Sequence, residues 1–329
     1  MMKSKMMMNN KLRKNIVILS IALILVCLFF VFSSIRKNNN KKEISDDYTM
    51  YYEYDGKLYY QNEDLQLILF AGLDSYDNNI VDSYRNSELS DCLVLLVLDN
   101  VNKTILPIQI NRDTMCTYKV LGIGGQIAGE SYGQIALAHT YGTGDMTSLV
   151  NTKDAVSELF FDVGIDYYMS LPMNAVSVLN DKAGGVSVFI EDDFSSIDPS
   201  LVQGEEVLLK GDQALTFVRS RSGLDDSSNI ARMERQRVYL RALFEKCSEL
   251  VKKDSSFSQD ALESISEYLI ANTNTYGLSD IMNTLLSYEL LDAVRLDGNA
   301  RKGDTYIEFY VDKAKLDKFC INTFYLEAN

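Results

Sequence analysis

The chain has 329 residues, 47% of them hydrophobic and 24% charged, which is ordinary for a globular protein. The first 45 residues hold nine of the 32 basic residues and one of the 46 acidic residues, so the remainder has a net charge of −22. Such a domain repels polyanions, which argues against nucleic-acid binding, and an anionic ligand would have to be held by local basic residues or a metal ion.

Residues 16–35 form an apolar segment without a charged residue, proline or glycine. At 1.5 Å per residue this segment would span about 30 Å, the thickness of the hydrocarbon core of a bilayer. Basic residues precede it, which favours a cytoplasmic N-terminus (1–15) and one membrane-spanning helix (16–35). We therefore expect a single-pass protein of the cell membrane, with a polar linker (36–47) and a large extracellular domain (48–329). A cleaved signal peptide is the alternative, although the apolar segment is long and no A-x-A site follows it.

Beyond residue 47, predicted strands and helices follow one another without an internal repeat. A tyrosine-rich segment contains the dipeptide Asp55-Gly56, which favours a tight β-hairpin. The predicted strands lie at 67–72, 92–98, 104–110, 186–190, 214–221 and 305–311, and the predicted helices at 151–161, 173–179, 230–252 and 279–288. Continuous apolar strands are typical of a sheet covered on both faces. The sequence therefore predicts one α/β domain, a three-layer α-β-α sandwich with a central mixed sheet.

Cysteine and histidine are sparse beyond the apolar segment, where His139 is the single histidine of the chain. The wide cysteine spacing fits neither a zinc site nor a C-x-x-C redox motif, and buried free thiols are favoured over disulfides. A histidine-rich metal site is excluded, and a Ser-His-Asp triad would have to use His139. These cysteines are Cys92, Cys116, Cys247 and Cys320.

Two aspartates stand at the ends of apolar strands, Asp74 in LFAGLDSY and Asp91 in ELSDCLVLL. Aspartate is common at turns and strand ends, so each of them alone has a structural explanation. As a pair on neighbouring strands they could hold one hard cation through oxygen ligands, and Mg²⁺ is the usual companion of phosphate.

Arginines recur at the ends of predicted elements. Arg112-Asp113 follows the strand at 104–110, and Arg219 and Arg221 alternate in the segment 214–221. On this predicted strand, a period of two aims both guanidinium groups the same way. On the helix at 230–252 a spacing of three and four residues puts several polar residues on one face. Those residues are Arg232, Arg235, Gln236 and Tyr239.

This concentration of arginines in an acidic domain has two interpretations. Surface salt bridges would contribute only about 0–1 kcal/mol each. A converging set of guanidinium forks would instead suit the oxygens of a pyrophosphate. The sequence contains no G-x-x-x-x-G-K-[ST] loop and no G-x-G-x-x-G after a strand, so a nucleotide is not indicated.

Several segments from about residue 65 to 325 resemble, in order and spacing, the LytR-CpsA-Psr family of cell-wall glycopolymer ligases. They are FAGLDS, LSDCLVLLVLD, ILPIQINRDTM, QIALAHTYG, DYYMSLPMNAVSVLNDKAGGVSVFI, LLKGDQALTFVRSR and ARMERQRVYLRAL. The resemblance implies a phosphotransferase that moves a glycopolymer from an undecaprenyl-pyrophosphate carrier to peptidoglycan. It also implies an α-β-α sandwich, with arginines on the pyrophosphate, Mg²⁺ on aspartates and the lipid tail in an apolar channel.

The resemblance also assigns roles to individual residues. Asp74 and Asp91 match the metal-binding carboxylates, and Asp91, Arg112 and Asp113 are the catalytic candidates, with Asp91 or Asp113 as the base. His139 lies in a stretch that could line the site, although a buried or supporting histidine is an equal alternative. The pyrophosphate-binding candidates are Arg112, Arg219, Arg221, Arg232, Arg235 and Gln236.

The sequence departs from the family pattern at several positions. The family usually has Arg-Ser-Asp-Thr where this chain has Leu89-Ser90-Asp91-Cys92, and Pro-Arg-Asp where it has Asn111-Arg112-Asp113. An arginine common after the first aspartate is Tyr76 here, and Asn229 stands where an acid usually precedes the helix arginine. Arg85 is a candidate substitute for one of the missing basic residues.

The leading hypothesis is therefore a membrane-bound phosphotransferase whose partners are a polyprenyl-pyrophosphate-linked glycopolymer, peptidoglycan and membrane lipid. Two alternatives remain open. One is a non-catalytic scaffold that binds lipid pyrophosphate during wall assembly, which the missing arginines favour. The other is a polyprenyl-pyrophosphate pyrophosphatase, in which water replaces the acceptor sugar.

Overall fold

The computed structural model describes residues 51–75 and 85–328. The described residues divide into two compact units, a small one with residues 51–60, 327 and 328 and a large one with residues 61–75 and 85–326. The predicted cytoplasmic segment (1–15), membrane span (16–35) and linker (36–47) lie outside the described residues. Within the described part of the chain, no helix is both long enough and apolar enough to cross a membrane.

The small unit contains the predicted hairpin. Strands β1 (Tyr51–Tyr54) and β2 (Lys57–Gln61) pair antiparallel, with Tyr54 opposite Lys57. Asp55 and Gly56 both have positive φ angles, 52° and 75°, as a two-residue type I′ turn requires. The predicted turn is therefore confirmed.

The large unit is built on a mixed sheet of seven strands, in the order β11-β8-β3-β4-β5-β12, with β13 also paired to β5. β3, β4 and β5 are antiparallel neighbours, whereas β8 runs parallel to β3, and β12 and β13 run parallel to β5. The predicted mixed α/β architecture with a central mixed sheet is confirmed. The strands are β3 (Leu65–Ser75), β4 (Glu88–Asp99), β5 (Thr104–Ile110), β8 (Tyr167–Pro172), β11 (Ile270–Ala271), β12 (Glu289–Leu290) and β13 (Val294–Arg295).

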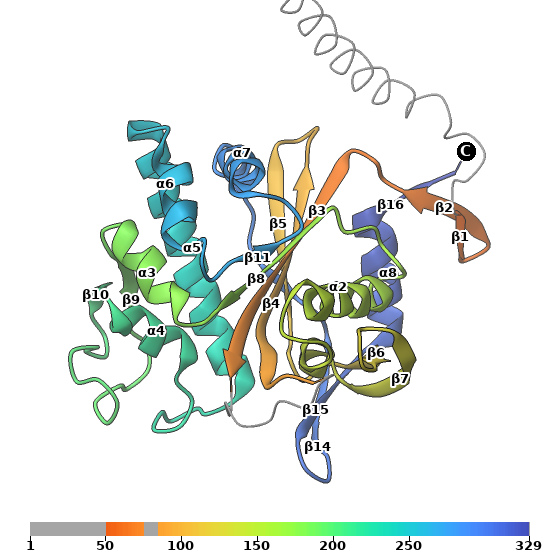
Figure 1. The fold of residues 1–329 in the computed structure, drawn as a ribbon, viewed down its shortest axis with the longest axis horizontal. Coiled ribbons are helices and arrows are strands. Elements are labelled where there is room, and N and C mark those ends of the chain that lie inside the picture. Colours follow the sequence, from red (N-terminus) through yellow and green to blue (C-terminus); the bar gives the residue numbers. More distant parts are fainter. Residues whose placement is uncertain (1–50, 76–84, 329) are drawn as a thin grey trace, which may run out of the picture. The chain divides into compact units, whose positions relative to one another are not determined.

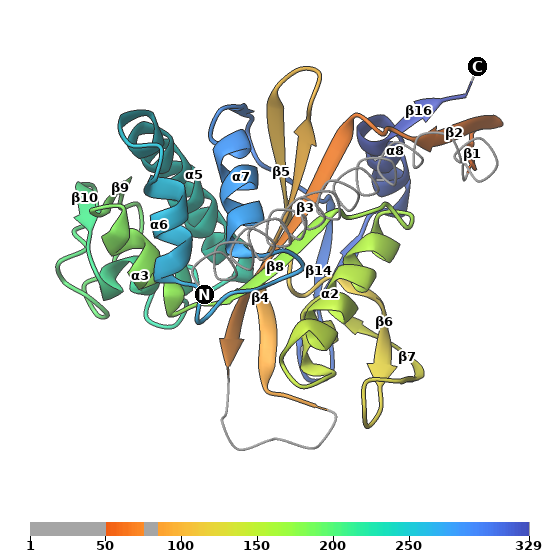
Figure 2. The same cartoon turned by 45° about the horizontal axis from the view of Figure 1, so that its top comes forward.

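Helices lie on both sides of this sheet (Figures 1 and 2). On one side are α3 (Ala175–Lys182), α4 (Asp212–Arg219), α5 (Asn229–Lys253), α6 (Phe257–Ser264) and α7 (Thr275–Leu285). On the other side are α2 (Met146–Leu159) and α8 (Lys313–Phe324).

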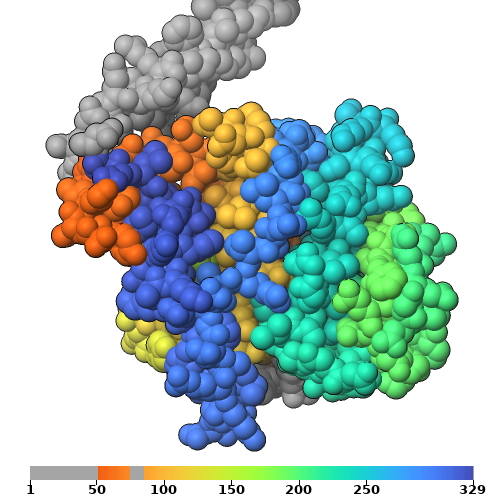
Figure 3. All heavy atoms as spheres, turned by 180° about the vertical axis from the view of Figure 1, so that it is seen from behind, coloured from red at the N-terminus to blue at the C-terminus, as the bar shows by residue number. Residues whose placement is uncertain are grey.

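The apolar sheet residues form a core with these helices. Ile68, Leu98 and Ile105 are buried, and Phe244 of α5 and Ile281 of α7 pack against them. Seen from behind, α5 and α7 (cyan and blue) lie beside the orange strands (Figure 3). The continuous apolar runs in the sequence are therefore explained by burial on both faces of the sheet.

Shorter elements complete the large unit. Three antiparallel hairpins are formed by β6 (Met115–Leu121) with β7 (Ile127–Gln134), β9 (Val186–Phe189) with β10 (Glu206–Leu209), and β14 (Gly298–Lys302) with β15 (Ile307–Val311). A 3₁₀ helix, η2 (Ile135–Thr140), follows β7, and β16 (Tyr325–Glu327) follows α8. The cysteines at 92, 116, 247 and 320 are free and buried, as predicted.

One predicted strand is wrong. The segment 214–221 is largely helical, because α4 extends from Asp212 to Arg219. Its buried residues, Ala214, Phe217 and Val218, follow the three- and four-residue spacing of one helix face. The other predicted strands and helices are confirmed in type, with ends that differ by a few residues, as for α2, α3 and α7.

Candidate functional site

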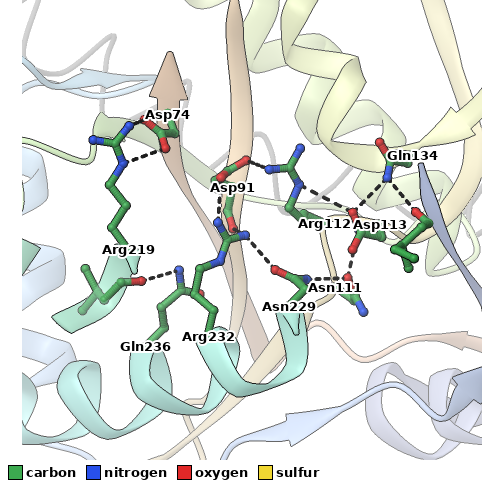
Figure 4. A network of polar contacts seen from close by, with 12 residues as sticks. Asp74, Asp91, Asn111, Arg112, Asp113, Gln134, Arg219, Asn229, Arg232 and Gln236 are labelled. Atoms are coloured by element: carbon green, nitrogen blue, oxygen red, sulfur yellow. Dashed lines mark hydrogen bonds and ion pairs between the residues drawn. The ribbon is translucent and has the colours of Figure 1, made fainter. Parts of the chain in front are cut away.

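Asp91 occupies a β-bulge in the middle of the polar cluster shown in Figure 4. Gly72 of β3 pairs with Cys92, and Leu73 pairs with Ser90, so Asp91 is the extra residue on β4. A bulge interrupts regular pairing and re-aims the side chain. It is here that the Asp91 carboxylate meets two arginines from other elements.

Both oxygens of this buried carboxylate accept hydrogen bonds from guanidinium groups. Arg232, in the first turn of α5, donates from Nη1 to Oδ2 at 2.8 Å, and Arg112, just after β5, donates to Oδ1. Arg232 Nη2 also donates to the main-chain carbonyl of Asp91 at 3.1 Å and to Asn229 Oδ1 at 2.7 Å. One carboxylate therefore holds two buried arginines in place.

A second carboxylate–arginine pair joins the end of β3 to the end of α4. Arg219 holds Asp74 through a bidentate fork, with Nε to Oδ2 at 2.9 Å and Nη2 to Oδ1 at 2.7 Å. The Arg219 side chain is 50% exposed, whereas the Asp74 side chain is 13% exposed. The pair is open to solvent on the arginine side, so Arg219 has room to move.

The arginines converge on one open pocket of about 440 Å³. Asp74, Arg219, Arg221 and Arg232 all line this pocket, which we call the arginine pocket. The sequence argument that Arg219 and Arg221 alternate on a strand is wrong, because Arg219 ends α4 and Arg221 lies in the following loop. They nevertheless line the same pocket, since the chain turns immediately after the helix.

Arg235 and Gln236 lie on the same buried face of α5 as Arg232, as the helical spacing predicted. Their hydrogen bonds, however, go to the main chain at the end of α4. Arg235 donates to the carbonyls of Phe217 and Ser220 and pairs with Asp192 at 2.5 Å. Gln236 Nε2 donates to the Val218 carbonyl at 3.3 Å. In this structure the two side chains hold in place the segment that carries Arg219 and Arg221.

Asp113 lines a larger hollow of about 810 Å³, together with Arg112 and Arg221. Because Arg221 also lines the arginine pocket, the two spaces share a wall. Asp113 Oδ1 accepts from Gln134 Nε2 at 2.9 Å and lies 3.6 Å from Arg112 Nε. Burial raises the pKa of the Asp113 carboxyl, against the opposing effect of the nearby arginines.

Two positions at which the sequence departs from the family pattern contact each other. Asn229 Nδ2 donates to Asn111 Oδ1 at 2.8 Å, and the same oxygen accepts the main-chain N–H of Asp113 at 2.9 Å. Because Asn229 also accepts from Arg232, this amide pair links the start of α5 to the loop after β5. The substituted residues therefore keep Arg232 and Asp113 in a fixed relationship.

The remaining sequence candidates lie at the edge of this site or away from it. His139 in η2 is fully buried, with Nδ1 3.9 Å from Glu88 Oε2, and burial lowers its pKa to about 4. The Arg85 guanidinium lies 4.8 Å from the ring centroid of Tyr141 and donates to Thr140 Oγ1 at 3.3 Å. Leu89 lines the larger hollow, and Tyr76 falls outside the described residues.

Two adjoining apolar cavities lie between the sheet and α5, and the first of them begins beside the Asp91 bulge. The first, of about 60 Å³, is lined by Gly72, Cys92 and Gln236 together with apolar side chains of α3 and α5. The second, of about 170 Å³, shares Phe70 and Leu240 with the first and continues along the sheet. A largely apolar path therefore runs between the sheet and α5 and starts next to the charged cluster.

Asp74 and Asp91 are the carboxylates that could hold a metal ion. Carboxylate oxygens suit Mg²⁺, but all four oxygens here accept from arginines. Arg219 is half exposed and can leave Asp74, so Asp74 fits a cation, whereas Asp91 is enclosed by two buried arginines. In residues 51–75 and 85–328, no group of three or more histidine, cysteine or acidic side chains forms a candidate metal site.

Comparison with known sequences identifies the family of this chain. The sequence model of the LytR_cpsA_psr family matches residues 27–323. A relative from Halalkalibacterium halodurans, the polyisoprenyl-teichoic acid–peptidoglycan teichoic acid transferase TagU, is 31% identical over 58% of this chain. That match spans about half of the relative, 54% of its length.

Solved structures share the fold. The crystal structure of Bacillus subtilis TagV matches with a TM-score of 0.59 and 22% identity, covering 80% of this chain and 96% of that one. A structure of TagT bound to LIIa-WTA matches with a TM-score of 0.60 and 21% identity, covering 79% of this chain and 90% of that one.

Proposed function

Because this chain belongs to the LytR_cpsA_psr family, we propose that it transfers a glycopolymer from a polyisoprenyl-pyrophosphate carrier to peptidoglycan. Relatives named as polyisoprenyl-teichoic acid–peptidoglycan teichoic acid transferases support this activity. Teichoic acid is therefore the glycopolymer with which the activity is best tested. The observation that carries the proposal is the convergence of Arg219, Arg221 and Arg232 on one pocket. Guanidinium forks of this kind match the oxygens of a pyrophosphate in charge and geometry.

The apolar path beside this pocket supports a lipid-linked donor. A pyrophosphate at the arginine pocket would have its isoprenoid tail next to Gly72 and Cys92, where the apolar cavities begin. Burial of each apolar methylene contributes about 0.8 kcal/mol, so a long isoprenoid would add substantially to donor affinity. The two cavities are narrow in this structure, and α5 would have to shift to admit a whole chain.

The reaction follows from the two adjoining spaces. The acceptor hydroxyl oxygen attacks the sugar-linked phosphorus and forms a new phosphodiester, while the bridging P–O bond of the pyrophosphate breaks and the polyisoprenyl phosphate leaves. Arg219, Arg221 and Arg232 would stabilise the charge on the phosphoryl oxygens and the leaving group.

Asp113 is our proposed base for the acceptor proton. It lines the larger hollow, and its raised pKa suits proton uptake better than that of an ordinary aspartate. Asp91 is less suited, because both of its oxygens already accept from arginines and its side chain is fully buried. Its proposed role is to position Arg112 and Arg232.

Mg²⁺ is part of the proposal as a cofactor held chiefly at Asp74. When bound, it would neutralise charge on the pyrophosphate oxygens. Binding there requires Arg219 to release Asp74, and the freed guanidinium could then turn to the pyrophosphate.

We also propose that residues 16–35 anchor the protein in the cell membrane, with the large domain outside. An extracellular domain would meet both peptidoglycan and the lipid carrier. Removing residues 1–45 should release a soluble protein that still unfolds cooperatively. If the shortened chain still sediments with membranes, the assignment of the anchor is wrong.

The function is tested by binding of a polyisoprenyl pyrophosphate. We expect the double variant Arg219→Ala/Arg221→Ala to lose about ten- to hundredfold in affinity, since a charge-assisted fork contributes about 1.5–3 kcal/mol. Arg301→Ala is the matched control, because Arg301 on β14 is exposed and lines neither the arginine pocket nor the two apolar cavities. If the two variants bind the polyisoprenyl pyrophosphate with equal affinity, the arginine pocket is not the donor site.

A further inference from the structure

The larger hollow shares Arg221 with the arginine pocket, but most of its lining is different. Asp113, Asp225 and Asp226 contribute carboxylates to it, and Tyr306 and Ile307 contribute an exposed apolar surface. Tyr306 is 61% exposed and Ile307 is 50% exposed, so both side chains are accessible to a ligand in the hollow. The donor pyrophosphate, placed against Arg219 and Arg232, leaves this space open.

Hydrogen bonds fix the apolar wall relative to Asp113. Gln134 Nε2 donates both to Asp113 Oδ1 at 2.9 Å and to the Ile307 carbonyl at 2.8 Å. The main-chain N–H of Phe309 donates to the Asp113 carbonyl at 2.8 Å. The β14–β15 hairpin therefore presents Tyr306 at a set position relative to the proposed base.

The charged side chains that line the hollow favour neutral or cationic ligands over anionic ones. Three carboxylates and two arginines line it, and one of those arginines, Arg112, is already paired with Asp91. The remaining excess of carboxylates disfavours a polymer of phosphates, and the net charge of −22 beyond the first 45 residues adds to that repulsion. The same carboxylates can accept hydrogen bonds from sugar hydroxyls or ammonium groups. The face of a tyrosine ring carries negative potential and packs against the C–H groups of a sugar ring.

We propose that this hollow is the acceptor site and that it binds a neutral or amine-bearing saccharide, with one sugar packed on Tyr306 and its attacking hydroxyl directed to Asp113. The inference rests on the proposed function and adds the chemistry of the acceptor to it. The donor polymer, if it carries phosphates, leaves the site elsewhere.

The test uses the full-length chain in proteoliposomes, with a polyisoprenyl-pyrophosphate-linked disaccharide as donor and a β-1,4-linked N-acetylglucosamine tetrasaccharide as acceptor. We expect Tyr306→Ala to raise the KM for the acceptor about five- to tenfold, with the donor KM unchanged. Tyr306→Phe should behave like wild type, because it keeps the ring. Tyr276→Ala is the control, since Tyr276 on α7 is 71% exposed and does not line the hollow.

A second variant tests the charge argument. Asp225→Asn/Asp226→Asn should leave the KM of a donor carrying a phosphate polymer unchanged and weaken an acceptor tetrasaccharide with a free amine. A fall in the donor KM would show that the polymer enters the hollow, and the inference would be wrong. An unchanged acceptor KM in Tyr306→Ala would overturn it as well.

The experiments give a different set of results if the proposed transferase function is wrong. In that case wild type and all variants would form no transfer product, whereas binding of the tetrasaccharide, measured by saturation-transfer NMR, would still report on the hollow. Loss of that binding in Tyr306→Ala, but not in Tyr276→Ala, would support a saccharide site. Equal binding in both variants would overturn it.

Discussion

The Asp91 carboxylate and the Arg232 guanidinium form a buried ion pair at 2.8 Å, where the bulge in β4 meets the first turn of α5. The Arg232 side chain is 2% exposed, and the Asp91 side chain is fully buried. Arg112 engages the other oxygen of the same carboxylate. This one aspartate therefore connects β4, the loop after β5 and α5, and it sets the direction of two arginines.

The first prediction concerns the stability of this cluster. Asp91→Asn leaves buried Arg232 without its counter-charge and leaves Arg112 with only the more distant Asp113, so the free energy of unfolding should fall by about 3–5 kcal/mol. Urea unfolding of the large domain measures this. Asp292→Asn is the control, because its side chain is 92% exposed and its pair with Arg241 should contribute at most about 1 kcal/mol. Equal losses for the two variants would contradict the structural role of Asp91.

The second prediction concerns the exchange of partners at Asp74. Arg219 competes with a cation for both Asp74 oxygens, so Arg219→Ala should tighten Mn²⁺ binding, up to about fivefold for an exposed ion pair. Asp74→Asn should abolish that binding. Water-proton relaxation follows Mn²⁺, a paramagnetic probe for Mg²⁺. If neither variant changes the affinity, Asp74 is not the cation site.

The third prediction uses the single histidine. Burial lowers the pKa of His139 from 6.5 to about 4, so the folded state keeps it neutral while the unfolded state takes up a proton below about pH 6.5. The stability contribution is complete above pH 6.5 and is lost as the pH falls through about 4. Between pH 7.5 and 4.5 the loss from His139 should be about 2–3 kcal/mol.

His139→Gln provides the comparison for this prediction, because it removes the titrating group and leaves the carboxylates in place. The difference in unfolding free energy between wild type and variant should narrow or reverse as the pH falls from 7.5 to 4.5. Two parallel stability curves over this range would show that His139 is not held neutral by burial.

The fourth prediction concerns Asp113. Because its pKa is raised, the transfer rate should begin to fall at a higher pH than expected for an ordinary aspartate. Asp113→Asn should lower turnover about 10²- to 10⁴-fold and remove this acidic limb, with little change in donor affinity. A variant that keeps the wild-type pH profile would exclude Asp113 as the base.

The raised pKa of Asp113 also predicts how this residue affects the free energy of unfolding. A raised pKa in an acid means that the folded state favours the protonated form, so its contribution is present below the unfolded pKa and is lost as the pH rises through the folded pKa. At neutral pH, Asp113→Asn should therefore be at least as stable as wild type in urea. A large loss of stability would point to a structural role.

Local pattern was enough to predict much of the fold and part of the site. The apolar runs at 67–72, 92–98 and 104–110 identified β3, β4 and β5, because strands buried on both faces need apolar residues throughout. The spacing of Arg232, Arg235 and Gln236 correctly predicted a shared helix face. These features depend on residues close together in the chain.

Features that depend on distant residues could not be predicted. The bulge at Asp91 follows from the register of β4 against β3. Tyr306 is placed at the site by contacts of its hairpin with distant residues, among them Gln134, which lies about 170 residues away in the sequence. The apolar pattern of the short segment 214–221 fits both the period of two of a strand and the spacing of a helix. The segment is helical because Phe217 and Val218 pack into a core that includes residues of α5 and β9. Sequence pattern alone did not distinguish these alternatives.

The central claim is transfer of a sugar-linked phosphate to an acceptor, and phosphorus NMR tests it directly. The full-length protein is incubated with a polyisoprenyl-pyrophosphate-linked glycopolymer, Mg²⁺ and peptidoglycan fragments. We predict that a phosphodiester on peptidoglycan and polyisoprenyl monophosphate appear at equal rates, and that Arg219→Ala/Arg221→Ala slows both. A free phosphomonoester at the polymer end without the phosphodiester would mean hydrolysis, and an unchanged but bound donor would mean a scaffold; either result would contradict the transferase.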